Sequence, residues 1–292
     1  MKDQKRWRIE NKDCMQLLKT IPDQEIDLVA IDPPYGIDVL NEKWDEDKIN
    51  RRKEAAAKST VGSIPVGMKF SPETSKRLGR FLYTVSEELI RVLKPGGFCL
   101  VFSQARSSHR VGVALEDAGF ELRDQLIWDY GAGQGKAQGM QNFIKKTKEI
   151  PEEEKSSIIA QLHGYKTPQL TPTFETIWLA QKPKEGKFWQ NFLKYNVGLV
   201  DFRDGNKKVC FSHRKPNKQE REMAGKHPTL KPKSLMVDLV KTFSTEDSLV
   251  LDCFCGSGTT AVAALEQGRR FLGGDLSEHW CRVASQRLSR FD

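Results

Sequence analysis

Two short stretches of the chain combine residue types that could do chemistry. The first is AIDPPYG, residues 30–36, which ends the apolar run IDLVAI with an acid, two prolines and a tyrosine. A strand must stop there, because proline cannot donate a ladder hydrogen bond. The stop leaves the Asp32 carboxylate and the Pro33 carbonyl as hydrogen-bond acceptors near the flat ring of Tyr35. Such a group could hold and stack a planar molecule that bears an amine.

The second stretch is LDCFCGSGTTA, residues 251–261, which reads as a strand, a glycine turn and a helix. Its last six residues match the pattern GxGxxG/A, and Asp275 follows 19 residues after Gly256. Glycines let the backbone approach a ligand, a helix N-terminus favours an anionic group, and the later acid accepts from ribose hydroxyls. The pattern indicates a nucleoside cofactor, although a tight turn that needs glycine, or an NAD site, would also explain it. Asp252 argues against NAD, because its carboxylate would repel a pyrophosphate but suit a cofactor that bears an ammonium group.

Apolar runs alternate with amphipathic patterns along most of the chain. The run Ile26–Ile31 is almost continuously apolar, as a strand buried on both faces requires. Strands separated by helices predict βα units and a mostly parallel sheet. The predicted strands are 7–10, 26–31, 98–103, 121–130, 173–181, 248–254 and 269–275, and the predicted helices are 14–21, 81–93, 111–120, 144–159, 233–243, 258–268 and 278–288.

Two segments interrupt this alternation. Residues 40–80 hold ten Lys or Arg against six Asp or Glu and show little apolar periodicity, which predicts a long insertion of functional or disordered character. Residues 182–226 are irregular, aromatic and basic. The chain carries a net charge of +8, which favours a polyanionic partner, although many soluble proteins carry such a charge for solubility alone.

Composition narrows the class of protein further. A hydrophobic content of 38% and a charged content of 29% fit a soluble globular protein. No stretch reaches the roughly 18 apolar residues of a membrane span, and the first residues show no apolar signal region, so we expect a cytoplasmic protein with no membrane partner. The six cysteines form no CxxC pair and lack zinc-ligand spacing with histidine. We therefore expect no metal site.

The two stretches, in this order and with HPTLKPKSLMVDLV (227–240) ahead of the second, resemble the β-group of S-adenosylmethionine-dependent DNA amino-methyltransferases. The resemblance includes IPDQEIDLVAIDPPYG, RVLKPGGFCLVF and FETIWLAQKP, and it is weak in residues 40–80 and 182–226. It implies an α/β fold, a doubly wound, mostly parallel Rossmann-like methyltransferase sheet with one antiparallel strand and an irregular target-recognition insertion. Asp32 and Gly256 should then face one cleft at the carboxyl ends of adjacent strands.

The family order also implies a division of the chain. Residues 1–181 would be the catalytic half of the methyltransferase domain, with the insertion at 40–80. Residues 182–226 would be the target-recognition region, and residues 227–292 would be the cofactor-binding half of the same domain.

The resemblance assigns residues to S-adenosylmethionine. Asp252 would hold the methionine ammonium, Asp275 the ribose hydroxyls and Asp13 the adenine amino group, although a helix cap explains Asp13 equally well. Thr229 and Lys231 would approach the methionine carboxylate, although the same segment could be only a proline-rich entry into a helix. The remaining residues lining the cofactor would be Phe254, Cys255, Gly256, Gly258 and Thr259.

For catalysis the resemblance implies Asp32, Pro33, Pro34 and Tyr35. The exocyclic amine of a base is a poor nucleophile, because its lone pair delocalises into the ring. Acceptors at Asp32 and the Pro33 carbonyl would favour a pyramidal nitrogen, and positioning and electrostatics would then carry an in-line methyl transfer. A base in duplex DNA must be flipped out, and Tyr35 would be its stacking face unless that ring serves only in packing.

The acid at position 32 favours adenine N6 as the target, because the cytosine-N4 members of the family more often carry serine there. A cytosine-N4 DNA methyltransferase and an RNA amino-methyltransferase stay open as alternatives. A non-enzymatic DNA-binding protein on a degenerate scaffold is a further alternative, and the intact Asp32, Tyr35, Gly256 and Gly258 count against it.

Residues 203–233 hold ten Lys or Arg against three Asp or Glu and are the best candidate for contact with double-stranded DNA. A solvated charged surface is the plain alternative. The insertion at 40–80 and the glycine-rich loop at 131–139 are further candidates. Family members often dimerise and serve in restriction-modification, and the sequence leaves a homodimer and a cognate restriction endonuclease open. The basic residues singled out for DNA contact are Lys207, Lys208, Arg214 and Lys215.

Overall fold

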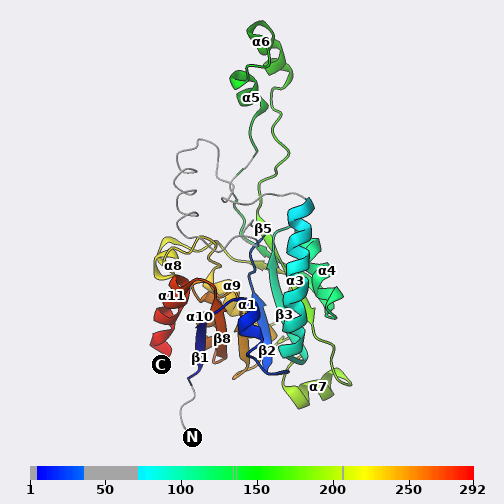
Figure 1. Ribbon diagram of the computed structural model, residues 1–292, viewed down its shortest axis with the longest axis vertical. Coiled ribbons are helices and arrows are strands. Elements are labelled where there is room, and N and C mark those ends of the chain that lie inside the picture. Colours follow the sequence, from blue (N-terminus) through cyan, green and yellow to red (C-terminus); the bar gives the residue numbers. More distant parts are fainter. Residues whose placement is uncertain (1–4, 36–71, 134, 136, 206) are drawn as a thin grey trace.

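The computed structural model describes residues 5–35, 72–133, 135, 137–205 and 207–292. These residues form one eight-stranded sheet in the order β1-β8-β7-β2-β3-β5-β4-β6 (Figure 1). β5 runs antiparallel to β3 and β4, and the other neighbouring pairs are parallel. The strands are β1 (Trp7–Asn11), β2 (Ile26–Ile31), β3 (Leu93–Ser103), β4 (Glu121–Asp129), β5 (Phe174–Gln181), β6 (Cys210–Ser212), β7 (Leu249–Asp252) and β8 (Arg270–Asp275).

The strand order reverses beside β2, whose six residues are all buried. On one side β2 pairs with β3, the next strand in the chain, and on the other side it pairs with β7 from the C-terminal part. Val29 lies opposite both Cys99 and Leu251. The carboxyl ends of β2 and β7 therefore meet at one edge of the sheet, which we call the carboxyl edge, and this is where ligands bind in doubly wound folds.

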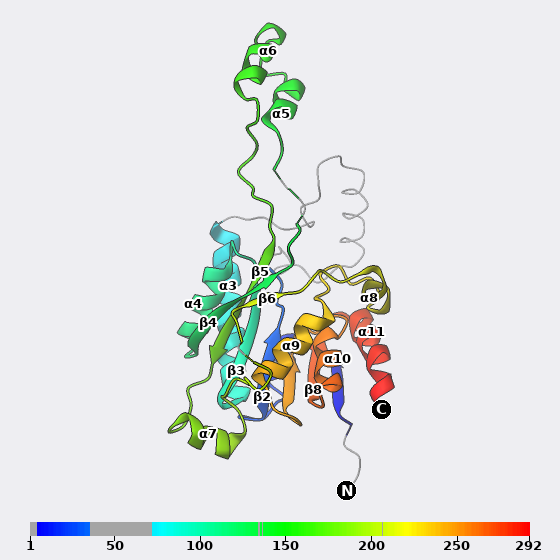
Figure 2. The same ribbon diagram turned by 180° about the vertical axis from the view of Figure 1, so that it is seen from behind.

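Helices cover both faces of the sheet (Figures 1 and 2). α1, α3 and α4 pack their buried leucines and valines on one face, and α9, α10 and the end of α11 pack on the other. The expected doubly wound sheet with one antiparallel strand is thus confirmed. The helices are α1 (Cys14–Leu18), α3 (Pro72–Val92), α4 (Ser108–Asp117), α5 (Met140–Lys146), α6 (Glu152–Gln161), α7 (Phe188–Tyr195), α8 (Lys218–Met223), α9 (Lys233–Phe243), α10 (Thr259–Glu266) and α11 (Glu278–Leu288), followed by the short 3-10 helix η2 (Ser289–Phe291).

The predicted insertion at 40–80 is too long at its C-terminal end. Residues 72–80 belong to α3, and residues 40–71 lie outside the described residues. Pro72 suits the first helical position because its missing N–H is not needed there. Leu78 and Leu82 are buried one turn apart, and Val85 and Leu89 continue the same face. The many charged residues of the first turns lie on the outer face and hide this periodicity.

The prediction of one charged helix at residues 144–159 is wrong. This segment is divided into α5 and α6, because Pro151 cannot lie inside a helix and disfavours helical geometry at the residue before it. The two helices pack together at the end of an extension that stands beyond the carboxyl edge (Figure 1). We call residues 131–173, as far as they are described, the arm.

The region 182–226 is also more regular than its sequence indicates. It contains α7, α8 and the short strand β6, which pairs with β4 and is the last strand on that side of the sheet. α7 lies at the amino edge of the sheet, where Asn191 donates to the Pro95 carbonyl at 2.9 Å. Among the described residues, no helix is long and apolar enough to cross a membrane.

Candidate active site

Four acids follow strands at the carboxyl edge. Asp32 comes directly after β2, Asp252 ends β7, Asp275 ends β8, and Asp13 lies two residues after β1. Because β8, β7 and β2 are consecutive in the sheet, Asp275, Asp252 and Asp32 lie along one stretch of the edge. The sheet thus brings together the two stretches that the sequence separates by more than two hundred positions.

Asp32 is at the centre of a group of polar side chains from three segments. Its Oδ1 accepts a hydrogen bond from the Tyr35 hydroxyl, and its Oδ2 accepts one from Lys231 Nζ. Lys231, in the segment before α9, is also 3.4 Å from Glu175 Oε2 on β5. The Lys231 side chain is only 9% exposed. A buried ammonium thus lies between two carboxylates.

The burial of this group shifts its protonation equilibria. Burial acts to lower the pKa of Lys231, but the charges of Asp32 and Glu175 outweigh it and the pKa is raised, so the lysine is charged. Burial raises the pKa of Glu175, and Lys231 opposes that shift. Burial and the two acids raise the pKa of Tyr35 well above its usual value. Tyr35 is therefore a neutral hydroxyl that can donate a hydrogen bond.

Two aromatic rings lie beside the Lys231 ammonium that pairs with Asp32. Pro33 is buried, Pro34 and Tyr35 are half-buried, and Tyr35 packs against the core on the α9 face. The Lys231 ammonium lies 5.6 Å from the ring centre of Tyr35 and 5.1 Å from that of Phe102. These contacts reduce access of water to the Asp32–Lys231 pair and strengthen its electrostatic interactions.

The glycine loop between β7 and α10 requires both of its glycines. Gly256 and Gly258 have φ values of +47° and +78°, which L side chains rarely adopt. A Cβ on Gly256 would lie 2.8 Å from His227 Nε2, and one on Gly258 would lie 2.9 Å from the Cβ of Ala284. The loop therefore lies against His227 and α11 without room for a side chain.

Asp252 is buried at the start of this loop, with 3% of its surface exposed. Its carboxylate accepts from the Thr260 hydroxyl at 2.6 Å and from the Phe254 amide at 3.0 Å. Burial is the main cause that raises its pKa to about 7, against the effect of these hydrogen bonds. No cation contacts this carboxylate among the described residues. A ligand with a positive group would supply the missing countercharge.

Asp275 closes the loop from the neighbouring strand. Its Oδ2 accepts from the Gly256 amide and its Oδ1 from the Ser277 amide, both at 2.9 Å. Burial raises its pKa. Each carboxylate oxygen has two lone pairs, so both oxygens can still accept from a hydroxyl of a bound molecule.

The other residues predicted to bind the cofactor differ in their contacts and burial. Asp13 caps α1 by accepting from the Met15 amide at 2.9 Å, which is the alternative role weighed for it. Cys255 is buried, and Phe254 packs its ring edge-to-face with Phe81, with 6.2 Å between centroids.

The two threonines predicted to contact the cofactor differ in their surroundings. Thr229 is exposed. Thr259 is at the first position of α10, where its hydroxyl accepts from Arg287 at 3.3 Å.

Three residues that sequence reasoning missed contact the candidate site. Glu175 was seen only as part of a strand, although an acid in the apolar run FETIWLAQ is a signal that could have marked it. His227 lies against Gly256, with its ring 4.4 Å from that of Trp280. Arg287 donates to the Ser257 carbonyl at 2.5 Å, and burial lowers the pKa of this arginine to about 10. No local pattern marks Arg287, which reaches the loop from α11.

The four basic residues predicted for DNA contact are divided between two places. Arg214 and Lys215 follow β6 at the carboxyl edge, and the Lys215 ammonium is 3.9 Å from the ring centre of Tyr130. Lys215 also acts on the pKa of Glu175 by its charge, so it lies near the Asp32 group. Lys207 and Lys208 come before β6 instead.

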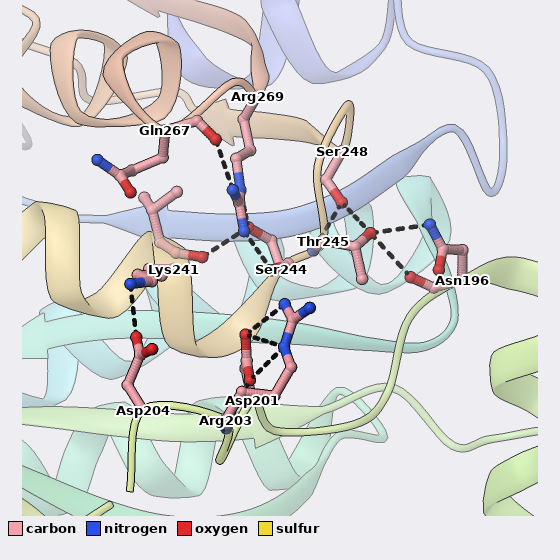
Figure 3. Close-up of polar contacts among 11 residues, drawn as sticks. Asn196, Asp201, Arg203, Asp204, Lys241, Ser244, Thr245, Ser248, Gln267 and Arg269 are labelled. Atoms are coloured by element: carbon pink, nitrogen blue, oxygen red, sulfur yellow. Dashed lines mark hydrogen bonds and ion pairs between the residues drawn. The ribbon is translucent and has the colours of Figure 1, made fainter.

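Lys207 lies near acids at the opposite edge of the sheet, since its charge helps to lower the pKa of Asp201 and of Asp204. Figure 3 shows these acids paired with Arg203 and with Lys241 in the last turn of α9. The neighbouring Ser244 and Arg269 come shortly before β7 and β8, at the amino ends of those strands. Lys207 is thus remote from Asp32.

Comparison with known proteins finds a matching family model and similar sequences. A family model described as DNA methylase, N6_N4_Mtase, matches residues 26–286. The chain is 29% identical to the Type II methyltransferase M.HindIII of Haemophilus influenzae, over 96% of this chain and 94% of that protein. It is 26% identical to the Type II methyltransferase M2.DpnII of Streptococcus pneumoniae, over 95% of this chain and 88% of that protein.

Two solved structures share the fold. The complex of M1.HpyAVI with SAM is 17% identical, with a TM-score of 0.59 over 97% of this chain and 99% of that one. The PvuII DNA methyltransferase, named as cytosine-N4-specific, is 15% identical, with a TM-score of 0.59 over 96% of this chain and 86% of that one.

Proposed function

The chain belongs to the family of N6/N4 DNA methylases, and from this we propose that it moves a methyl group from S-adenosylmethionine to the exocyclic N6 of a flipped adenine in double-stranded DNA. One observation carries the proposal. A carboxylate followed by two prolines and a tyrosine lies at the end of β2, and the glycine loop with its buried Asp252 lies at the end of the adjacent β7. A cofactor held at the loop and a base held at Asp32 would then share one edge of the sheet.

The residues of the loop fit S-adenosylmethionine. Asp252 is a buried acid without a countercharge among the described residues, which suits the methionine ammonium. Asp275 has free acceptor positions for ribose hydroxyls. When bound, this cofactor supplies an electrophilic methyl group on a positively charged sulfur.

Asp32 and Pro33 would prepare the amine. Asp32 accepts from Tyr35 and Lys231 and still has one lone pair on each oxygen. One of these and the Pro33 carbonyl would accept the two N–H groups, favour a pyramidal nitrogen and so free its lone pair. Tyr35 would stack on the flipped base, and Pro34 would hold the turn that places the ring. Orientation and electrostatics in a site with little water would carry the rate.

Adenine is the favoured base because residue 32 is an acid. The fold alone does not separate the two bases, since a structure that shares it is named cytosine-N4-specific. The alternative is a cytosine-N4 DNA methyltransferase, and an RNA amino-methyltransferase is a more distant one.

We expect the purified protein to transfer labelled methyl groups to double-stranded DNA, and nuclease digestion with mass spectrometry to find N6-methyladenine. N4-methylcytosine alone in the digest would refute adenine as the target. Methylation of RNA but not of DNA would refute DNA as the substrate. Calorimetric titration with S-adenosylmethionine and with NAD is the binding control, and only the first should bind.

Double-stranded DNA would approach the carboxyl edge, where Asp32 is. Arg214 and Lys215 lie at this edge and are exposed, so they are the favoured phosphate contacts. The arm stands beyond the same edge (Figure 1). The last turn of its helix α5 carries Lys145 and Lys146. We therefore extend the DNA-contacting surface from the basic segment after β6 to the arm.

Reversing the charges of Arg214 and Lys215 to glutamate should weaken DNA binding about tenfold or more and lower the slope of log affinity against log salt by about two. The matched double change at Lys207 and Lys208, on the other side of β6, should have a smaller effect. Fluorescence anisotropy with a labelled duplex at several salt concentrations would measure both. Equal losses for the two pairs would contradict this assignment, and S-adenosylmethionine binding should not change in either.

The Type II methyltransferases to which the chain is similar lead us to place it in a restriction-modification system. A cognate restriction endonuclease and a homodimer stay proposals. Sequencing of methylated bases in DNA from cells that express the protein would reveal the recognition site, and sedimentation would give the oligomeric state.

A further inference from the structure

The most unusual feature outside the roles assigned above is the position of Lys231. The family resemblance implies that this lysine approaches the methionine carboxylate of the cofactor. In the structure its ammonium is bonded to Asp32 Oδ2 instead and is 3.4 Å from Glu175 Oε2. Asp32 is 199 positions away in the chain, and Glu175 comes from the antiparallel strand.

Glu175 is held in this group mainly by charge. Its Oε2 is buried and accepts no hydrogen bond among the described residues, so the ion pair with Lys231 is what compensates that oxygen. A buried carboxylate oxygen without a compensating charge is strongly unfavourable. The charged groups that face Glu175 are Lys231, Asp32 and Lys215, and of these Lys231 makes the ion pair.

Lys231 is in turn difficult to move. If its ammonium turned toward a cofactor carboxylate, Asp32 and Glu175, whose side chains are 22% and 25% exposed, would be left as neighbouring half-buried acids without their ion-pair partner. Breaking one side of a buried charge group is strongly unfavourable, because the remaining charges are neither solvated nor paired. The geometry therefore favours a lysine that stays on Asp32 throughout the reaction.

We propose that Lys231 and Glu175 are positioning residues: Glu175 holds the Lys231 ammonium against Asp32 Oδ2, and this contact fixes the Asp32 carboxylate for the amine of the base. The proposal rests on the proposed function, since it concerns how Asp32 meets that amine. It differs from the role implied by the family resemblance, in which Lys231 binds the cofactor.

The test separates rate from cofactor affinity. Lys231→Met should lower the single-turnover rate at saturating S-adenosylmethionine and DNA about a hundredfold, because a mispositioned carboxylate loses most of its effect. The dissociation constant of S-adenosylmethionine, measured by calorimetry, should change less than about threefold. Glu175→Gln should lower the rate about tenfold, and Lys231→Arg should recover part of the loss. A Lys231→Met protein with an unchanged rate and weakened cofactor binding would overturn the proposal.

A double-mutant cycle tests whether Glu175 acts through Lys231. The combination of Glu175→Gln with Lys231→Met should be no slower than Lys231→Met alone, because residues that act as one unit are not additive. Multiplying effects would overturn that part of the proposal. The matched controls are Glu185→Gln and Lys194→Met, an exposed pair 2.7 Å apart beyond the other end of β5, and both should retain the wild-type rate.

A second readout is independent of turnover. Without Lys231 the acid Glu175 loses its main countercharge, so the melting temperature of Lys231→Met, relative to wild type, should fall as the pH rises from about 5 to about 8. Adding Glu175→Gln should reduce this dependence. A wild-type protein that transfers no methyl group would refute the proposed function. A melting-temperature difference between Lys231→Met and wild type that does not change with pH would instead refute the proposal that Lys231 compensates the charge of Glu175.

Discussion

Replacing Asp32 with alanine is expected to lower methyl transfer to DNA about a thousandfold, or roughly 4 kcal/mol in the barrier, while S-adenosylmethionine still binds. The carboxylate is the acceptor for the amine in the proposed mechanism, and it lies at the end of β2, outside the glycine loop that would hold the cofactor. Single-turnover transfer of labelled methyl groups measures the rate, and calorimetry measures the cofactor affinity.

Two further changes make this prediction specific. Asp32→Asn keeps the shape and one acceptor oxygen but loses the charge that pairs with Lys231, so it should recover little activity. Asp117→Ala, an exposed acid on α4, is the matched control and should behave as wild type. If Asp32→Ala abolished cofactor binding as well, the assignment of Asp32 to the base would be wrong.

Asp252 should make S-adenosylmethionine binding depend on pH. Its carboxyl has a pKa of about 7 because it is buried, and an ammonium group binds only the ionised form. Below pH 7 the affinity should therefore fall by up to about tenfold per pH unit, with release of a proton. Above about pH 8 an α-amino group loses its own proton, so affinity should peak between these values. Calorimetry in buffers of different ionisation enthalpy measures both the affinity and the proton release.

The variant Asp252→Asn should weaken S-adenosylmethionine binding about a hundredfold, or roughly 3 kcal/mol, and remove the proton release. In the absence of cofactor, the same substitution should make the protein more stable than wild type at high pH. In the wild type the raised pKa means that stability falls as the pH rises from about 4 to about 7, by about 4 kcal/mol in total. Asparagine has no such loss, so the variant should melt above wild type at about pH 8 and close to it at about pH 4. A variant less stable at every pH would contradict the protonation argument.

Local sequence was enough to predict much of the architecture. The run Ile26–Ile31 has to be a buried strand, and Pro33 has to end it, since both follow from side-chain polarity and from the missing proline N–H. Gly256 and Gly258 mark a turn with positive φ in the same way. Where local signals were ambiguous the prediction was wrong, as for residues 72–80, whose charged outer face concealed the start of α3.

The placement of the basic residues depended on the sheet. Lys207 and Arg214 are close in sequence and looked alike, but β6 separates them, so that one lies near Asp201 and Asp204 and the other at the carboxyl edge. Likewise Pro151 was visible in the sequence, but the position of α5 and α6 beyond the carboxyl edge followed only from the strands β4 and β5 that carry the arm.

The candidate active site shows the same division between local sequence and tertiary structure. Residue types and spacing were enough to select Asp32, Tyr35, Asp252 and the glycine loop as candidates, because each lies in a short segment whose backbone geometry its own residues dictate. The pairing of Lys231 with Asp32 and Glu175 was decided by the sheet, which brings β2, β5 and the segment before α9 to one place. Because a buried charge is unfavourable without a partner, these acidic and basic groups pair with one another. A contact between residues 199 positions apart cannot be recognised from the local sequence.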